Sequence, residues 1–134
     1  MKPLLKDLSS ALLKFHRGLL VFQTEMAEKI DGRKYAPYDL LNLSLNDPRF
    51  SWLRKFSELI VQIDTIVDDK KDLPFDVAEI VHAVKKLVTL DESADTTEML
   101  AALKADSSIM IPLGQVRQHV LALENAVKAE HNKK

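Results

Sequence analysis

No cysteine occurs among the 134 residues, and glycine and proline occur only three and five times. Without a thiol the chain has no disulfide, thiolate zinc site, iron–sulfur cluster or cysteine nucleophile, so thiol redox and thiol catalysis are excluded. No apolar run approaches the roughly 20 residues that a membrane-spanning helix requires. Lys6, Asp7 and Lys14 interrupt any secretory signal at the start. These absences predict a cytoplasmic protein that does not enter a membrane.

The chain also has little net charge, with 19 basic and 20 acidic side chains. Proteins that coat nucleic acid work mainly by neutralising phosphate, so this balance disfavours a nucleic-acid partner. The charge is uneven along the chain: residues 1–55 hold ten basic and six acidic side chains, residues 56–98 four and eleven, and residues 99–134 five and three. Either packed helices offset one another's charge, or a basic face binds an acidic partner.

Apolar side chains recur at steps of three or four along residues 3–31, which predicts one long amphipathic helix. Asp31-Gly32 is expected to end it, because glycine readily adopts the left-handed backbone that closes a helix. Gly18 lies inside this helix, either to allow close approach of a neighbour or as a tolerated cost of about 1 kcal/mol relative to alanine. The stripe, about 43 Å long at 1.5 Å per residue, consists of Leu4, Leu8, Leu12, Phe15, Leu19, Phe22, Met26 and Ile30.

The same periodicity predicts helices over residues 37–45, 48–69, 75–91 and 112–131. A further short helix is expected from the capping box Asp95-Thr96-Thr97-Glu98 through Leu103, broken by Ser107-Ser108. Asp47 is the expected N-cap of the third helix, whose two adjoining apolar rows predict the central helix. No run has the period-two pattern of a strand. We therefore predict an all-α fold, with residues 1–134 as a single domain: a compact bundle of four long amphipathic helices plus two short helices.

The strongest metal-like pattern is Glu79-Ile80-Val81-His82, because E-x-x-H on a helix supplies ligands in carboxylate-bridged di-iron bundles. Such a site needs two copies of the motif and two further glutamates, and only one copy is present. The helical wheel places Glu79 and His82 away from the apolar stripe, in solvent. With no G-x-S-x-G and no glycine-rich phosphate loop, we predict no catalytic residues, no metal site and no cofactor.

Two other histidines, His16 and His119, lie at the boundary between the apolar and polar faces of the first and last helices. If these helices pack side by side, the two imidazoles could meet and bind a metal or respond to pH. Neither histidine has a carboxylate three or four residues later to orient it. A small-ligand or metal-binding helical bundle is therefore the alternative function.

Basic residues surround aromatic ones at the start of the third helix, where Arg49, Arg54 and Lys55 lie near Phe50 and Trp52. A nucleic-acid interface uses this combination. An ordinary amphipathic helix explains it as well, with the aromatic rings packed inside and the cations on the opposite face. Nucleic-acid binding remains the less favoured interpretation.

The first helix is apolar over more than one face, because Leu13 and Leu20 lie far around the helix from the main stripe. His16 and Gln23 fill the space between. Two interpretations stay open. Either neighbours wrap this helix on two sides, or Leu13, Leu20 and His16 form an exposed face that binds a partner or a second copy of the chain.

The middle of the chain carries an N-D-P turn, a W-L-R and a following apolar helix that bears I-D. These elements lie in the segment Leu45-Asn46-Asp47-Pro48-Arg49-Phe50-Ser51-Trp52-Leu53-Arg54-Lys55-Phe56-Ser57-Glu58-Leu59-Ile60-Val61-Gln62-Ile63-Asp64. The segment resembles one found in a family of small uncharacterised helical bacterial proteins. The resemblance implies a bacterial cytoplasmic origin; it brings no assigned activity and identifies no site residues.

These observations together favour a non-enzymatic helical protein–protein interaction module. We expect it to bind a protein partner or to form a homo-oligomer such as a homodimer, with the first helix as the contact.

Overall fold

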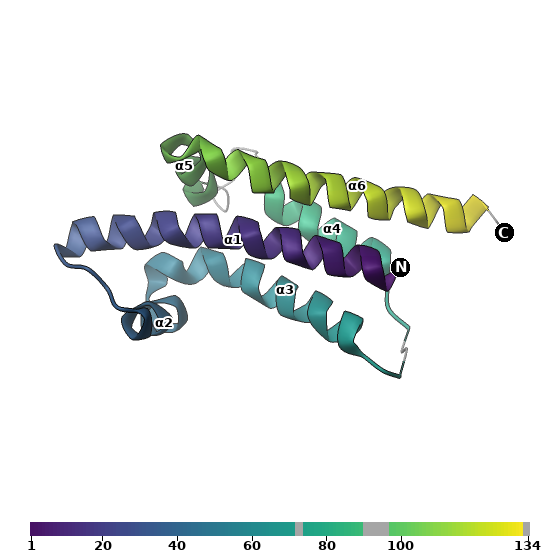
Figure 1. The fold of residues 1–134 in the computed structure, drawn as a ribbon, viewed down its shortest axis with the longest axis horizontal. Helices are drawn as coiled ribbons and strands as arrows, with labels where there is room; N and C mark the ends of the chain where they lie inside the picture. Colours follow the sequence, from purple (N-terminus) through teal and green to yellow (C-terminus); the bar gives the residue numbers. More distant parts are fainter. Residues whose placement is uncertain (72–73, 90–96, 133–134) are drawn as a thin grey trace.

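The computed structural model describes residues 1–71, 74–89 and 97–132, and every regular element in these ranges is helical (Figure 1). The all-α prediction is therefore confirmed. Within the described residues no helix is both long enough and apolar enough to cross a membrane. In chain order the elements are α1 (Lys2–Asp31), α2 (Pro37–Asn46), η1 (Pro48–Phe50), α3 (Ser51–Asp68), α4 (Val77–Val88), α5 (Thr97–Ala105), η3 (Ser107–Ile109) and α6 (Met110–Asn132).

The central helix is α1, which lies between α3 and α6, and both neighbours run antiparallel to it (Figure 1). The prediction that the third helix is central was wrong, although α3 does contact α1, α2 and α4. The broad apolar face of α3 covers only one side of α1, whereas α1 is covered by α3 on one side and by α6 and α5 on another.

The buried side chains form one cluster that draws on α1, η1, α3, α4, α5, η3 and α6. Helix α2 contributes no buried residue. In the α1–α3 contact, the rings of Phe15 and Phe56 meet edge to face with centroids 5.6 Å apart. Such a pair stabilises a core by about 0.5–1.5 kcal/mol beyond its buried area.

The apolar stripe predicted for α1 holds along most of the helix but not at its end. Leu8, Leu12, Phe15 and Leu19 are buried. Met26 and Ile30 are exposed, and Gln23 and Ala27 are buried in their place. The buried face of α1 therefore rotates around the helix in its last turns. There α1 packs against the N-terminal end of α3, which carries Trp52.

Several predicted helix ends are confirmed and others shift. Gly32 closes α1 in the left-handed conformation, with φ 67°. The Asp47 side chain caps the third segment as predicted, but residues 48–50 form a 3-10 turn before α3 begins. Helix α4 is shorter than predicted. Ser107 and Ser108 lie between α5, which ends at Ala105, and α6, as predicted, but they form the 3-10 turn η3, which leads directly into α6 and in which Asp106 accepts the Ser108 N–H. The predicted capping box begins at Asp95, outside the described residues.

Gly18 allows a close approach between α1 and η3. A Cβ atom at this position would lie 3.3 Å from Cγ1 of Ile109. Of the two explanations that the sequence left open for this glycine, the structure favours close approach, because even an added Cβ would require Ile109 to shift by a few tenths of an ångström.

Candidate functional site

Polar side chains spaced seven residues apart along α1 form hydrogen bonds to α3. The Ser9 hydroxyl donates to Oδ1 of Asp64 at 2.5 Å, and Nε2 of His16 lies 3.2 Å from the Ser57 hydroxyl. Farther along, Gln23 accepts the indole N–H of Trp52. Seven-residue spacing keeps side chains on nearly the same face of a helix. We call this row the α1–α3 seam; Ser9 and Gln23 within it are buried.

His16 is half-buried in this seam. Its ring lies 6.4 Å, centroid to centroid, from that of Phe56. Burial lowers the pKa of the His16 imidazole below its ordinary value, because the charged form loses hydration there. The imidazole forms its hydrogen bond with the Ser57 hydroxyl on α3. His16 is therefore a packing and hydrogen-bonding residue of the α1–α3 contact.

The described residues offer no set of metal ligands for the hypothesis of a site near His16 and His119. Among them, no group of three or more histidine, aspartate or glutamate side chains is placed to hold a metal ion. His119 on α6 is half-buried, and the His16 ring lies against Ser57 and Phe56 of α3. Glu79 and His82 are both exposed on α4, as the helical wheel indicated.

The face predicted on α1 is only partly open to solvent. Leu13 is 42% exposed, whereas Leu20 is half-buried and packs against the core. His16, the third member of this face, turns its ring toward α3. The open part of the predicted face is thus essentially the Leu13 side chain.

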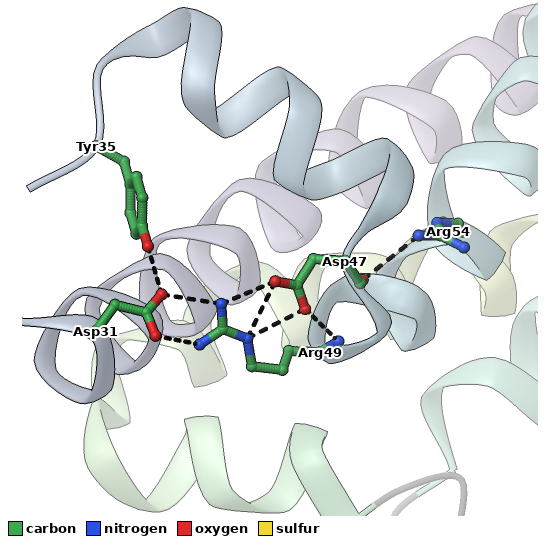
Figure 2. Close-up of polar contacts among 5 residues, drawn as sticks. All are labelled: Asp31, Tyr35, Asp47, Arg49 and Arg54. Carbon is green, nitrogen blue, oxygen red and sulfur yellow. Dashed lines mark hydrogen bonds and ion pairs between the residues drawn. The ribbon is translucent and has the colours of Figure 1, made fainter.

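Among the described residues, the most extensive polar cluster lies where α1 ends and α3 begins, and its centre is Arg49. Figure 2 shows the guanidinium between two carboxylates. Nη1 and Nη2 donate to the two oxygens of Asp31 at 3.2 and 3.0 Å, and Nε and Nη2 donate to Asp47 at 2.8–3.2 Å. The phenol of Tyr35 also donates to Asp31. We call these contacts the Arg49 cluster.

The charges of the Arg49 cluster offset one another. Asp31 is the last residue of α1, where the exposed carbonyls disfavour an anion. Hydrogen bonds from Arg49 lower the pKa of Asp31, and the one from Tyr35 lowers it further. The side chain of Arg49, and then its backbone N–H, lower the pKa of Asp47. Both carboxylates thereby stay ionised and hold the arginine in place.

Arg54 forms hydrogen bonds with the backbone at the C-terminal end of α2. Its Nε donates to the Ser44 carbonyl at 3.1 Å and its Nη2 to the Asp47 carbonyl at 3.4 Å (Figure 2). Arginine commonly satisfies the last carbonyls of a helix in this way. Two of the three cations considered above as a nucleic-acid interface, Arg49 and Arg54, are therefore engaged within the protein.

These contacts hold α2 at both ends. On the N-terminal side, the backbone N–H of Tyr35 donates to Oε2 of Glu28 at 2.8 Å, and Asp39 accepts the Ala36 N–H. On the C-terminal side, Arg54 holds the backbone of Ser44 and Asp47. Helix α2 buries no residue fully, so the polar contacts at its ends help to position it beside the apolar packing of Leu43.

The solvent side of α2 is apolar. Tyr38, Leu41 and Leu45 are 81%, 59% and 63% exposed. At 100° per residue they fall within about 60° of one another around the helix, on the side opposite Leu43, which packs against the core. We call these three residues the α2 outer face. The spacing was present in the sequence, but which side of so short a helix would be covered depended on contacts with η1 and α3.

The border of the α2 outer face is polar but uncharged. Asn42 and Asn46 lie beside the three apolar residues, and Nδ2 of Asn46 donates to Oδ1 of Asn42 at 2.6 Å. The only charged residue of α2 is Asp39, which is half-buried. A contact confined to these three apolar residues and this border therefore buries no charged residue of α2.

Comparisons of the chain with protein-family models, curated proteins and solved structures find no match.

Proposed function

We propose that this protein is a non-enzymatic interaction module that presents the α2 outer face to an uncharged, apolar helix face of another polypeptide. The observation that carries the proposal is the exposure of three large side chains, Tyr38, Leu41 and Leu45, on one side of a helix. Clustered apolar surface of this kind marks protein contacts in monomeric domains, whereas isolated exposed leucines do not.

The way α2 is held supports this role. A helix that serves only to cover a core turns its large apolar side chains inward, but α2 contributes no buried residue. The Arg49 cluster and Arg54 fix its ends, so the outer face has a defined position before any partner binds. A preorganised face loses little conformational entropy on binding, and that strengthens the complex.

The composition of the face defines the chemistry of the partner. An acidic or basic partner would lose hydration on this uncharged surface without gaining an ion pair, so an apolar partner fits better. Tyr38 is the expected anchor, because tyrosine is enriched among the residues that dominate binding energy. The Leu13–His16–Leu20 face of α1 remains a second predicted contact, with less exposed apolar surface.

The expected setting is the bacterial cytoplasm. The resemblance of residues 45–64 to a segment of small bacterial proteins and the absence of cysteine support that expectation.

Site-directed photo-crosslinking in living cells tests the proposal. A photoreactive phenylalanine analogue replaces Tyr38 in one version of the chain and Leu121 in a control. Leu121 is 58% exposed but lies on α6. The proposal expects a crosslinked polypeptide from position 38 and not from position 121. That polypeptide, purified, should bind the native chain.

Binding strength then provides the decisive measurement. Leu41→Glu should weaken the complex by about tenfold or more, equivalent to about 1.4 kcal/mol, because a carboxylate would be buried without a partner. Leu121→Glu should leave the affinity unchanged. Equal loss with both variants, or no crosslink from position 38, would refute the role of the α2 outer face.

A further inference from the structure

We propose that the polypeptide bound by the α2 outer face is a second copy of this chain, packed so that the two α2 helices run antiparallel across a two-fold axis. The inference rests on the proposed function and adds the identity of the partner. It follows from three properties of the face: its charge, its symmetry and its size.

The charge of the face suits a copy of itself. In a two-fold contact every residue meets the same surface that it belongs to, so any charge near the axis would meet a like charge. The α2 outer face and its asparagine border carry none. One hydrogen bond already joins the amide groups of Asn42 and Asn46, so two of their four polar atoms keep a partner when the face is covered.

The spacing of the face is nearly symmetric along the helix. Tyr38 and Leu45 lie seven residues apart, about 10 Å at 1.5 Å per residue, and the midpoint falls between positions 41 and 42. When two such helices cross antiparallel, Tyr38 of each copy meets Leu45 of the other. The two Leu41 side chains then meet close to the axis.

The antiparallel direction is also the favourable one for the helix dipoles. The N-terminus of each α2 helix then lies beside the C-terminus of the other, so opposite partial charges face each other. A parallel arrangement would place like ends together and would not align Tyr38 with Leu45.

The size of the face sets the strength of the dimer. A stable interface covers about 800 Å² on each partner, and a ten-residue helix is only about 15 Å long. A contact made by α2 alone falls at the weak end of the range. The dimer is therefore reversible and concentration-dependent, without the large apolar interface of an obligate dimer.

Sedimentation velocity of the full chain, from low-micromolar to near-millimolar concentration, tests the inference. The native chain should shift from monomer toward dimer as concentration rises. Leu41→Glu should stay monomeric across the range, whereas Leu121→Glu should behave as the native chain does. Circular dichroism should be unchanged in both variants, since both leucines are exposed. If Leu41→Glu alters the fold, Leu45→Glu replaces it.

A charge-pairing experiment tests the two-fold geometry directly. Leu41→Glu and Leu41→Lys should each be monomeric alone, because like charges would meet near the axis. An equimolar mixture should regain a heterodimer, since a carboxylate then faces an ammonium group. A native chain that stays monomeric at the highest concentration, or a mixture that regains no dimer, overturns the inference.

The two proposals fail separately. If position 38 crosslinks to a different polypeptide that Leu41→Glu releases, while the native chain is monomeric, the α2 outer face binds a partner but not its own copy. If neither a partner nor a dimer depends on Leu41, both proposals are wrong.

Discussion

Trp52 donates its indole N–H to Oε1 of Gln23 at 3.1 Å, and this hydrogen bond joins α3 to α1 in a region largely removed from water. It satisfies two polar groups that would otherwise be buried without partners. The same principle applies along the α1–α3 seam, where no described buried side-chain nitrogen or oxygen lacks a hydrogen-bond partner.

Gln23→Ala should lower the free energy of unfolding by about 1–3 kcal/mol, because the Trp52 N–H would remain without a partner. Gln23→Leu combined with Trp52→Phe removes donor and acceptor together and should cost less than the sum of the single changes. Urea unfolding measures all three variants. Gln118→Ala, at an exposed position on α6, is the control and should stay within about 0.5 kcal/mol of the native chain. Strict additivity in the double variant would contradict the pairing.

His16 should make the stability of the protein depend on pH below neutrality. Its pKa is lowered by burial, so the unfolded chain takes up the proton before the folded chain does. Stability is therefore fully present above the unfolded value of about 6.5. It falls as the pH drops from there through the lower, folded value.

His16→Gln should remove this part of the pH dependence, as measured by thermal unfolding between neutral and mildly acidic pH. Glutamine keeps a polar group near Ser57 but does not titrate. His82→Gln, at an exposed position on α4, serves as the control and should leave the native profile in place. An identical profile for the native chain and His16→Gln would show that burial of this imidazole does not affect folding.

The two helical glycines should respond oppositely to larger side chains. Gly114→Ala should stabilise the protein by up to about 1 kcal/mol, because nothing lies within 4 Å of the added Cβ and alanine favours helix. At Gly18 the same gain is offset by contact with Ile109, and Gly18→Leu should cost about 1–3 kcal/mol through overpacking. Chemical denaturation provides the comparison. A stabilising Gly18→Leu would mean that α1 and η3 do not approach as described.

Arg49→Gln should loosen α2 while leaving the central helices intact. The change removes the guanidinium that bridges Asp31 and Asp47, so backbone amides of residues 37–46 should exchange with solvent faster. The pKa values of both carboxyls, followed by NMR, should rise toward the usual range. Arg49→Lys should restore little, because an ammonium group cannot make two bidentate contacts. Arg17→Gln, at an exposed position on α1, is the control; exchange that rises equally across α1 and α3 would contradict a local role.

Much of the fold could be predicted because its signals are local. The helix end at Gly32 and the cap at Asp47 each depend on a few neighbouring residues, and the structure confirms both. The Arg49 cluster joins residues 18 positions apart, and no sequence pattern gave the direction in which the chain returns after α1. The basic residues there consequently resembled a solvated face.

The α2 outer face escaped prediction for a related reason. Leucines lie on both sides of α2, and the sequence alone did not distinguish Leu43, which packs inward, from Leu41, which is exposed. Which leucine faces inward depends on which side of α2 packs against η1 and α3. The first-helix face was predicted from residues around α1, and two of its three members, Leu20 and His16, are half-buried.

The position of α1 affects how the protein can be made. Its core side is completed by α6, the helix farthest from it in the chain. A ribosome adds about 5–20 residues per second, so α1 exists for several seconds before Leu113, Val116 and Val120 can cover it. During that interval α3 is the main part of the nascent chain that can cover the apolar side chains of α1. A ribosome that stalls before α6 should therefore leave an aggregation-prone intermediate, which a chaperone would have to protect.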